Sequence, residues 1–178
     1  YFSFVPQEGF IFSGSIYENV RLEYGGDSDL QNDLPLIESA LQVAQFKTDL
    51  GNFPDGLKTE LGERGVNLSG GQKQRLNLAR AVVFQRPIVL LDDSLSAVDV
   101  ETERLLVDSL IFGEWVASTR LLVTHRLSVL KKVDRILFLK EGRLFASGKL
   151  SALLAEVPEF REFVQSMSEE AADGNIQP

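Results

Sequence analysis

A serine and two glycines at the start of a helical pattern are the first residues whose types and spacing suggest chemistry. Ser69 directly precedes Gly70 and Gly71, and apolar residues at helical spacing follow. The first N–H groups of a helix have no intrahelical acceptor, and the helix dipole favours an anion such as phosphate beside them. Glycine lets such a ligand come close to the backbone. A structural helix with a serine cap and loop glycines is the alternative. The candidate phosphate-binding residues are Leu68, Ser69, Gly70, Gly71 and Gln72.

Two aspartates follow a short apolar run that is typical of a central strand in a parallel sheet. The run covers residues 88–91, and Asp92 and Asp93 come directly after it. Open α/β sheets bind ligands at the carboxyl ends of their strands. Asp92 could help to hold Mg²⁺ there through its water shell, and Asp93 could polarise a water molecule for attack on a phosphate. A pair of acidic caps in a loop is the alternative interpretation.

Gln7 and His125 also follow predicted strands, which are the apolar runs 2–5 and 120–123. If the strands are parallel, both side chains reach the same edge of the sheet as Asp92. The amide of Gln7 can accept a hydrogen bond from a metal-bound water and donate to a phosphate, and the imidazole of His125 can donate to a phosphate oxygen. A lone histidine is nevertheless more often structural or exposed than catalytic.

The alternation of strand and helix patterns predicts an α/β fold built on a parallel sheet. Residues 15–67 carry no strand signal and indicate a helical insert, so the expected helical subdomain covers about residues 15–85. Ser15 and Glu18 have the spacing of a capping box at the start of its first helix. The expected strands are 2–5, 88–91, 120–123, 135–139 and 143–147, and the expected helices include 16–22, 46–50, 72–85, 98–112, 127–130, 150–155 and 159–166.

The composition limits the classes of function. The chain has 178 residues, enough for one domain with a sizeable core, and its formal net charge of −8 argues against nucleic acid as the main partner. The lack of cysteine and the single histidine exclude thiolate catalysis and a multi-histidine metal site. No apolar run approaches the length of a membrane span, so a membrane connection would come through a partner or another part of the protein. Residues 168–178 are expected to form a disordered tail.

Together these residues resemble the nucleotide-binding domain of ATP-binding-cassette (ABC) transporters, in particular of exporters. The resemblance covers residues 2–167, and its motifs occur in the family's order. Residues 5–7 resemble the Q-loop, 68–72 are identical to the signature sequence, 88–92 match Walker B, 96–99 match the D-loop and His125 matches the H-loop. Residues 60–65 resemble the loop that, in exporters, touches the coupling helices of the membrane domain.

The resemblance implies a P-loop NTPase-like parallel-sheet core with a helical subdomain, and a domain that binds and hydrolyses ATP with Mg²⁺ to power an exporter. In the family, two such domains form a head-to-tail dimer in which the Walker motifs of one domain hold each ATP and the signature of the other covers it. The implied partners are a second nucleotide-binding domain and a transmembrane domain, which would hold the chain at the cytoplasmic face of a membrane. The implied roles are catalytic for Asp93, His125 and Gln7, metal-binding for Asp92 and Gln7, and nucleotide-binding for 68–72 and Asp99.

The sequence departs from the family's pattern in two places, of which the first is the P-loop. The residues Gly-x-x-x-x-Gly-Lys-Ser/Thr occur nowhere in the chain. We therefore expect residues 1–167 to be a partial nucleotide-binding domain with an incomplete core, whose Walker A lies before Tyr1. The signature would then act in trans on an ATP presented by a partner, and the chain alone would bind MgATP weakly and be inactive.

The second departure is Asp93, where the family has a glutamate as its catalytic base. Aspartate is one methylene shorter, so its carboxylate is expected to fall roughly one ångström short of the attacking water, and catalysis is sensitive to such displacements. With this aspartate, residues 91–99 resemble the first nucleotide-binding domain of multidrug-resistance-protein-like exporters. We expect the ATP site to which Asp93 belongs to be slow, or specialised for holding ATP.

Two other functions remain open at this point. A non-hydrolysing regulatory nucleotide-binding domain would agree with Asp93 and with the missing P-loop. A non-transporter ABC ATPase of DNA repair or translation would also carry the motifs. DNA-repair members, however, insert long coiled coils between the Q-loop and the signature, whereas about sixty residues without sustained heptads intervene here.

Overall fold

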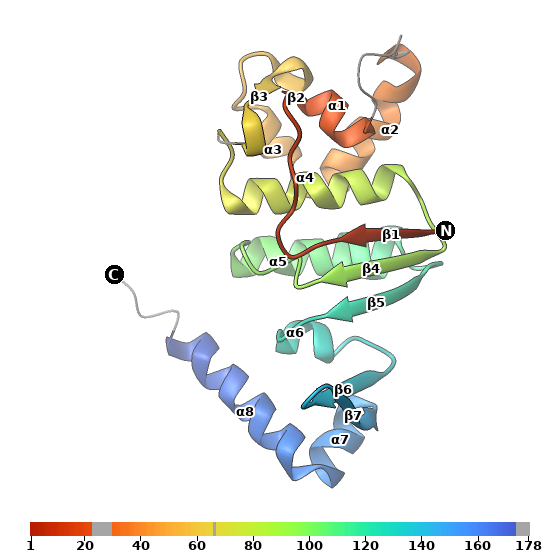
Figure 1. Ribbon diagram of the computed structural model, residues 1–178, viewed down its shortest axis with the longest axis vertical. Coiled ribbons are helices and arrows are strands. Elements are labelled where there is room, and N and C mark those ends of the chain that lie inside the picture. The colour runs from red at the N-terminus through yellow and green to blue at the C-terminus, as the bar shows by residue number, and fades with distance from the viewer. Residues whose placement is uncertain (23–29, 66, 174–178) are drawn as a thin grey trace. The chain divides into compact units, whose positions relative to one another are not determined.

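A computed structural model of the chain describes residues 1–22, 30–65 and 67–173 and divides into two compact units. The first unit is Tyr1–Val123 and the second is Thr124–Pro178. Figure 1 shows their helices and strands, and each unit is treated separately below.

The first unit is built on a three-stranded parallel sheet with the strand order β1-β4-β5. These strands are β1 (Phe2–Val5), β4 (Ile88–Asp92) and β5 (Thr119–Val123). Leu90 pairs with both Phe4 and Leu121, so the three strands end at the same edge of the sheet. The prediction of an α/β fold with a parallel sheet is confirmed.

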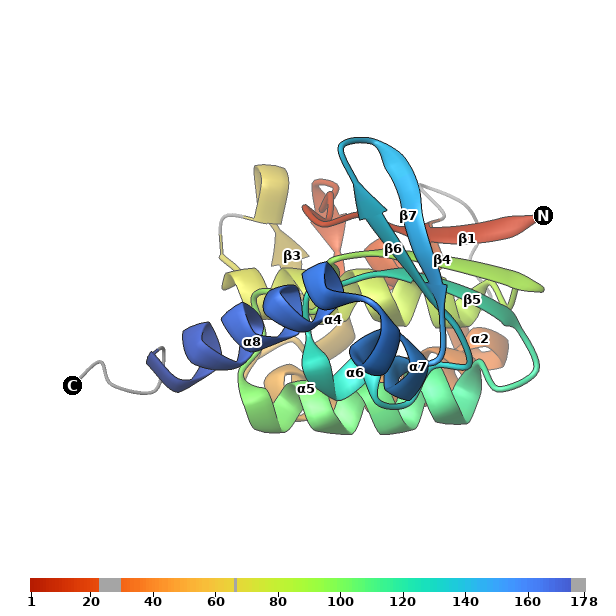
Figure 2. The ribbon, with the colours of Figure 1, turned by 90° about the horizontal axis from the view of Figure 1, so that it is seen from below.

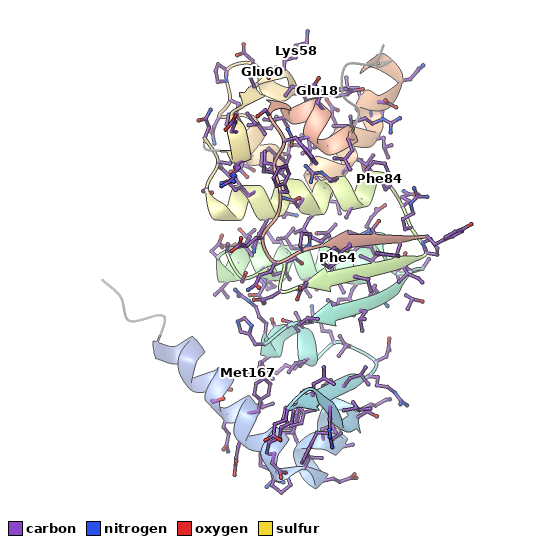
Figure 3. The ribbon with its side chains drawn as sticks, in the orientation of Figure 1. Phe4, Glu18, Lys58, Glu60, Phe84 and Met167 are labelled. Atoms are coloured by element: carbon purple, nitrogen blue, oxygen red, sulfur yellow. The ribbon has the colours of Figure 1, made fainter. Side chains whose placement is uncertain are left out.

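One face of this sheet is buried and the other is exposed. Val5, Val89 and Leu91 are almost fully buried, and a helical segment lies along their side of the sheet (Figures 1 and 2). On the other face, Phe2 is 58% exposed and Phe4, labelled in Figure 3, is 53% exposed. An apolar run such as 2–5 predicts a strand but does not reveal whether both of its faces are covered.

The segment that covers the sheet begins as α5 (Val100–Leu106) and continues as a π-helix (Val107–Glu114), where a single helix over 98–112 was expected. Leu106 and Leu110 are buried. Trp115 follows the end of the segment and is 2% exposed. A π-helical stretch depends on local packing rather than on the spacing of apolar residues, which is why the sequence did not indicate it.

The helical subdomain packs around the helix that follows the signature. The helices α1 and α2 both contact α4, and the capping box predicted for Ser15 and Glu18 is present, with the Glu18 N–H 3.2 Å from the Ser15 hydroxyl oxygen. The apolar core of the subdomain includes Ile16, Ile37 and Leu76, which are fully buried. The helices of the subdomain are α1 (Ile16–Arg21), α2 (Leu30–Val43), α3 (Lys47–Leu50) and α4 (Gly70–Val83).

The insert also contains a pair of two-residue strands, although no strand was expected in residues 15–67. The strand β2 (Gly14–Ser15) pairs antiparallel with β3 (Glu60–Leu61), and the Ile16 N–H donates to the Thr59 carbonyl oxygen over 3.0 Å. Short 3₁₀ helices at Gly56–Lys58 and Glu63–Gly65 flank β3. Strands of this length have no apolar alternation that a sequence could show.

The second unit packs a hairpin against helices. Glu141 and Gly142 form the turn that joins its two strands, and both residues have positive φ angles, 52° and 72°, as a type I′ turn requires. The elements are α6 (Leu127–Leu130), β6 (Ile136–Lys140), β7 (Arg143–Gly148), α7 (Leu150–Glu156) and α8 (Pro158–Asp173). The buried core consists of Leu130, Ile136, Leu153, Phe160, Val164 and Met167.

The chain's last helix is longer than expected. A disordered tail was predicted from residue 168, but α8 continues to Asp173, and residues 174–178 lie outside the described part of the chain. Within the described residues, no helix combines the length and the apolar character needed to span a membrane.

Candidate functional site

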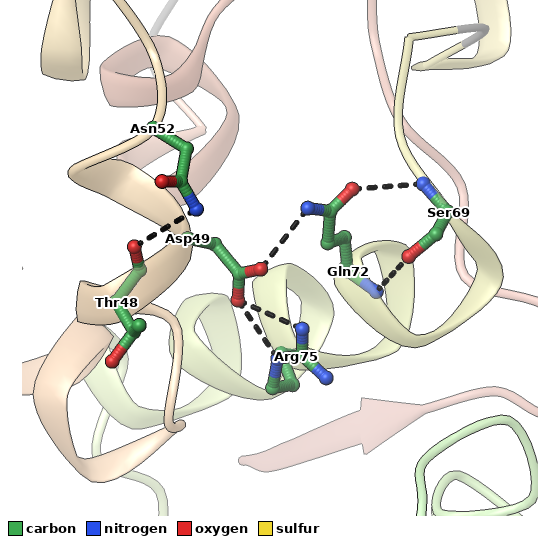
Figure 4. Close-up of polar contacts among 6 residues, drawn as sticks. All are labelled: Thr48, Asp49, Asn52, Ser69, Gln72 and Arg75. Carbon is green, nitrogen blue, oxygen red and sulfur yellow. Dashed lines mark hydrogen bonds and ion pairs between the residues drawn. The ribbon is translucent and has the colours of Figure 1, made fainter.

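The signature, residues 68–72, forms a capped helix start. The Gln72 N–H donates to the Ser69 hydroxyl oxygen over 3.2 Å, and the Ser69 N–H donates to the Gln72 amide oxygen over 2.9 Å (Figure 4). Ser69 therefore caps α4, as the alternative of a structural helix start predicts. It does not exclude anion binding, because the N–H groups of Gly70 and Gly71 in the first turn still have no intrahelical acceptor. Ser69 and Gly70 are exposed, so an anion can reach this turn.

The second signature glycine lies against the segment that follows the aspartate pair. A Cβ added to Gly71 would lie 3.0 Å from the carbonyl oxygen of Ala97 and 3.2 Å from Nη1 of Arg75. These distances are too short for a side chain without rearrangement. A glycine at position 71 therefore allows the signature and the D-loop, residues 96–99, to touch.

A buried glutamine connects these two segments. Gln74 is 5% exposed, and its side-chain amide donates to the Ser96 hydroxyl oxygen over 3.0 Å and accepts from the Ala97 N–H over 2.9 Å. The amide thus uses both its ends to hold the D-loop on α4. Sequence reasoning missed Gln74, because the pattern of a helix does not show which polar residue is buried.

Asp99, a predicted nucleotide-binding residue, is the N-cap of α5. Its carboxylate accepts from the Thr102 N–H over 2.9 Å, and hydrogen bonds from Thr102 hold the pKa of the Asp99 carboxyl below its usual value. The carboxylate is exposed and ionised at neutral pH, so it stabilises the positive end of the helix dipole.

The structure brings Gln7 and Asp93 together at the carboxyl edge of the sheet. Because β1 and β4 are parallel neighbours, the residues after them meet there, and the Gln7 Nε2 donates to Asp93 Oδ2 over 3.4 Å. Asp93 has a φ of 41°, in the left-handed region, and its N–H donates to the Val123 carbonyl oxygen over 2.9 Å. Asp92, the last residue of β4, is partly exposed beside it.

His125 is the candidate that belongs to the second unit. It is an exposed residue that follows the end of β5 by two positions, at the start of that unit. Its neighbours form a turn in which the Arg126 N–H donates to the Thr124 hydroxyl oxygen over 3.1 Å. A catalytic role for His125 stays a prediction.

A partly buried arginine holds the segment after Gln7 on α4. The Arg80 guanidinium donates to the carbonyl oxygens of Phe10 and Asn19 over 3.0 and 2.8 Å, and to the amide oxygens of Asn77 and Asn19 over 2.8 and 3.2 Å. It also lies 5.3 Å from the ring centre of Phe12. Burial lowers the pKa of Arg80 to about 10, so the group stays charged at neutral pH.

The same segment makes further close contacts. The Phe12 N–H donates to the Asn19 amide oxygen over 2.9 Å, and the Asn19 amide donates back to the Phe12 carbonyl oxygen over 3.0 Å. A Cβ added to Gly9 would lie 2.0 Å from the Asn77 amide nitrogen, so only glycine fits there. These contacts connect the position of Gln7 to the helix that carries the signature. The sequence did not indicate this role of Arg80, because Phe10 and Asn19 lie 70 and 61 residues away from it.

We expect Arg80→Lys to lower the free energy of unfolding of the chain by about 2–3 kcal/mol, because an ammonium cannot reach all the oxygens that the guanidinium satisfies. Chemical unfolding followed by circular dichroism measures the change. The exposed Arg86, beyond the end of α4, gives the matched control Arg86→Lys. Equal losses in the two variants would contradict the role assigned to Arg80.

Comparison with known proteins identifies the family. The sequence model of the ABC transporter family matches residues 1–96, which is more than half of the chain. The chain belongs to the ABC transporter family. The membership predicted from the motifs is therefore confirmed.

Individual ABC proteins match over nearly the whole chain. The chain is 37% identical to the ABC-type transporter cicA of Emericella nidulans over 171 residues. This alignment covers 96% of the chain and 12% of that protein. The chain is 37% identical to the mycobactin import ATP-binding/permease protein IrtB of Mycolicibacterium smegmatis, over 98% of the chain and 29% of that protein. A solved structure of a bacterial Atm1-family ABC exporter with ATP bound superposes with a TM-score of 0.83 at 32% identity, over 94% of this chain and 28% of that one.

The chain thus spans less than a third of the length of these relatives, and the solved exporter confirms its α/β fold as that of an ABC ATPase. The residues at the sheet edge fit the Mg²⁺ that accompanies ATP. Asp92 offers carboxylate oxygens, and the Gln7 amide, which donates through Nε2 to Asp93, has its oxygen at the other end. Among the described residues no cluster of three or more histidine or acidic side chains could hold a metal. Mg²⁺ at nucleotide sites needs only one or two protein ligands besides phosphate and water.

Proposed function

We propose that the chain is the nucleotide-binding part of an ABC exporter, which binds and hydrolyses ATP in a head-to-tail dimer. The observation that carries this proposal is the start of α4, where the capping box leaves two glycine N–H groups for a phosphate and Gln74 holds the D-loop beside them. The partner would be a second nucleotide-binding domain, in the same chain or in another. A transmembrane domain would place both at the cytoplasmic face of a membrane.

In this proposal the signature serves an ATP that the partner domain holds. Gly70 and Gly71 donate hydrogen bonds to its terminal phosphate, and the exposed cap of Ser69 lies at the same surface. The D-loop moves with the signature because Gln74 connects them. Closure of the dimer would therefore bring both segments to the nucleotide together.

The residues at the sheet edge serve the chain's own ATP site. Mg²⁺, when bound, neutralises charge on the phosphates. Asp92 and the oxygen of Gln7 would hold it, and Asp93 would polarise the attacking water. For His125, which belongs to the second unit, the resemblance implies a donor to a terminal phosphate oxygen. The hydrogen bond from Gln7 to Asp93 supports a shared role of the two residues at one site.

Export rather than import is supported by the solved exporter, by the resemblance of residues 60–65 to the loop that meets exporter coupling helices, and by the resemblance of residues 91–99 to multidrug-resistance-protein-like exporters. One relative is named for import, so transport by the intact protein is the measurement that decides the direction.

A second candidate function is a nucleotide-binding domain that holds ATP without hydrolysing it. Asp93 is the observation that favours this function, because its carboxylate reaches less far than that of the usual glutamate. The two functions differ only in the rate of one ATP site, and they share the fold, the partners and the signature.

The variant Gly70→Ala tests whether the signature binds phosphate. A Cβ at position 70 would lie 3.5 Å from the nearest atom, the Cβ of Ala97, which is an ordinary contact, so the fold tolerates alanine. The methyl group would nevertheless obstruct a ligand at the first N–H groups of α4. We expect the ATPase activity of the intact protein to fall at least tenfold while the unfolding free energy stays equal or rises by up to about 1 kcal/mol. Gly51→Ala, with its nearest contact also at 3.5 Å, is the control, and unchanged ATPase activity in Gly70→Ala would contradict the proposal.

The variant Asp93→Glu tests the reach of the base. In the intact protein we expect hydrolysis at this site to rise by about ten- to a hundredfold, because the longer side chain brings the carboxylate to the water. Asp92→Glu makes the same change at the neighbouring residue and should lower activity, since it displaces a metal ligand. If Asp93→Glu leaves the rate unchanged, distance does not limit this site.

The third test concerns the 178-residue chain alone. We expect no tight MgATP binding in a calorimetric titration, because the sequence contains no P-loop lysine or glycine-rich cradle to hold the phosphates. Addition of a partner domain that carries a P-loop should produce ATP-dependent association with the chain. Tight, Mg²⁺-dependent binding of ATP by the chain alone would contradict the proposal that its signature works in trans.

A further inference from the structure

An aspartate outside all of the motifs recognised in the sequence lies against the signature. Asp49, on α3, uses one carboxylate oxygen, Oδ1, to accept from the Gln72 side-chain amide over 3.0 Å (Figure 4). Its other oxygen, Oδ2, accepts from Nε and Nη2 of Arg75 over 3.1 and 2.8 Å. The side chains of Arg75 and Asp49 are only 13% and 16% exposed, so this ion pair is largely shielded from water.

The carboxylate determines which way the Gln72 amide faces. A side-chain amide has a donor end and an acceptor end, whereas an ionised carboxylate only accepts. The NH₂ group of Gln72 must therefore face Asp49, and its oxygen then faces the Ser69 N–H at 2.9 Å. A reversed amide would set two oxygens against each other at Asp49 and lose the hydrogen bond to Ser69. Half of the capping box thus depends on a residue from another helix.

The same carboxylate also fixes the guanidinium beneath the second glycine. The Cβ position of Gly71 is 3.2 Å from Nη1 of Arg75, so this group forms one wall of the first turn of α4. Asp49 holds Arg75 in that place through two hydrogen bonds. A single side chain therefore restrains the first turn of α4 at Gln72 and at Gly71.

The short helix that carries Asp49 is itself well anchored. Phe46, directly before α3, is fully buried and stacks on Phe53 with 6.4 Å between the ring centres. The Asn52 N–H donates to the Asp49 carbonyl oxygen over 2.9 Å, and the Asn52 amide donates to the Thr48 carbonyl oxygen over 3.4 Å (Figure 4). These contacts hold the backbone of α3 in place and with it the carboxylate of Asp49.

We propose that Asp49 is a positioning residue of the signature, which orients the N–H groups of Gly70 and Gly71 for the phosphate. The proposal rests on the function proposed above, in which these groups meet an ATP held by a partner domain. Without the carboxylate, the Gln72 amide turns freely and Arg75 loses its counter-charge inside the protein. The N–H groups in the first turn of α4 are then no longer held in one orientation.

The test exchanges the charge between the two residues. Asp49→Asn removes the negative charge and replaces one of the two acceptor oxygens by a donor, and Gln72→Glu sets two carboxylates against each other at a contact of 3.0 Å. The double variant Asp49→Asn/Gln72→Glu keeps the net charge. Its new amide donates to its new carboxylate, whose second oxygen still accepts from the Ser69 N–H. Two detrimental single changes should therefore compensate each other when combined.

In the intact protein we expect each single variant to lower kcat for ATP hydrolysis about tenfold, with KM for ATP changed less than threefold. The change falls on kcat because the signature acts in the closed dimer, whereas groups of the partner domain set the affinity for ATP. The double variant should recover at least half of the loss on a logarithmic scale. Asp55→Asn, at an exposed acid of the same subdomain, is the control and should change neither constant.

A second measurement needs no ATPase activity. The Ser69 N–H is protected by the Gln72 amide oxygen, so its hydrogen exchange in the 178-residue chain reports the orientation of that amide. We expect exchange about tenfold faster in Asp49→Asn and near the original rate in the double variant, with circular dichroism spectra unchanged. Exchange that is equally slow in Asp49→Asn would overturn the proposed role in the cap.

The outcomes separate this proposal from the function on which it rests. A loss of activity in Gly70→Ala without one in Asp49→Asn would overturn the role of Asp49 and leave the function intact. A double variant as slow as the slower single variant would also overturn it, because charge exchange should restore the contact. If Gly70→Ala is fully active, the proposed function fails, and the exchange of the Ser69 N–H alone then decides whether Asp49 orients the cap.

Discussion

Polar side chains on a buried helix must find hydrogen-bond partners, and the arrangement of the first unit follows from the partners that those of α4 find. Gln72 contacts Asp49, Gln74 contacts the D-loop, and Arg80 contacts the segment after Gln7. Each contact joins α4 to a part of the chain at least 22 residues away, as between Gln74 and Ser96. The helices α1 and α2 pack on the same helix, and α1 is also held there by the hydrogen bonds from Arg80 to Asn19. The helix therefore acts as the common support of the Q-loop, the signature and the D-loop.

The contacts of α4 with the Q-loop segment and with α3 are made by two arginines in different environments. Among the described residues, the guanidinium of Arg80 donates only to neutral oxygens, and it remains charged because its pKa of about 10 lies well above neutral pH. Neutral partners satisfy its donors without a second buried charge, so the contact does not depend on pH near neutrality. Asp49 and Arg75 form an ion pair instead, nearer to the N-terminal end of α4. The two ends of one helix are thus held by two different kinds of interaction.

Much of the fold and of the site could be predicted from local patterns, and what was missed depends on distant contacts. The signature helix, the hairpin at Glu141 and the strand before Asp92 have strong local signals, and the structure has all three. Asp49 and Gln74 gave no signal, because their partners lie 23 and 22 residues away and either side chain could have faced water. The exposed face of β1 was missed for a related reason, since burial depends on which elements cover a sheet.

The left-handed backbone at Asp93 places two opposing demands on one residue. Its φ of 41° belongs to a region where aspartate and asparagine are enriched among residues other than glycine, because a short polar side chain can bond to the nearby backbone. A longer acid gains reach towards a water molecule but lacks that compatibility with the backbone. Selection for speed at this position would therefore act against the local conformational preference. A chain that only needs to retain its nucleotide has no reason to accept that cost, and the turn after β4 can keep the residue that suits it best.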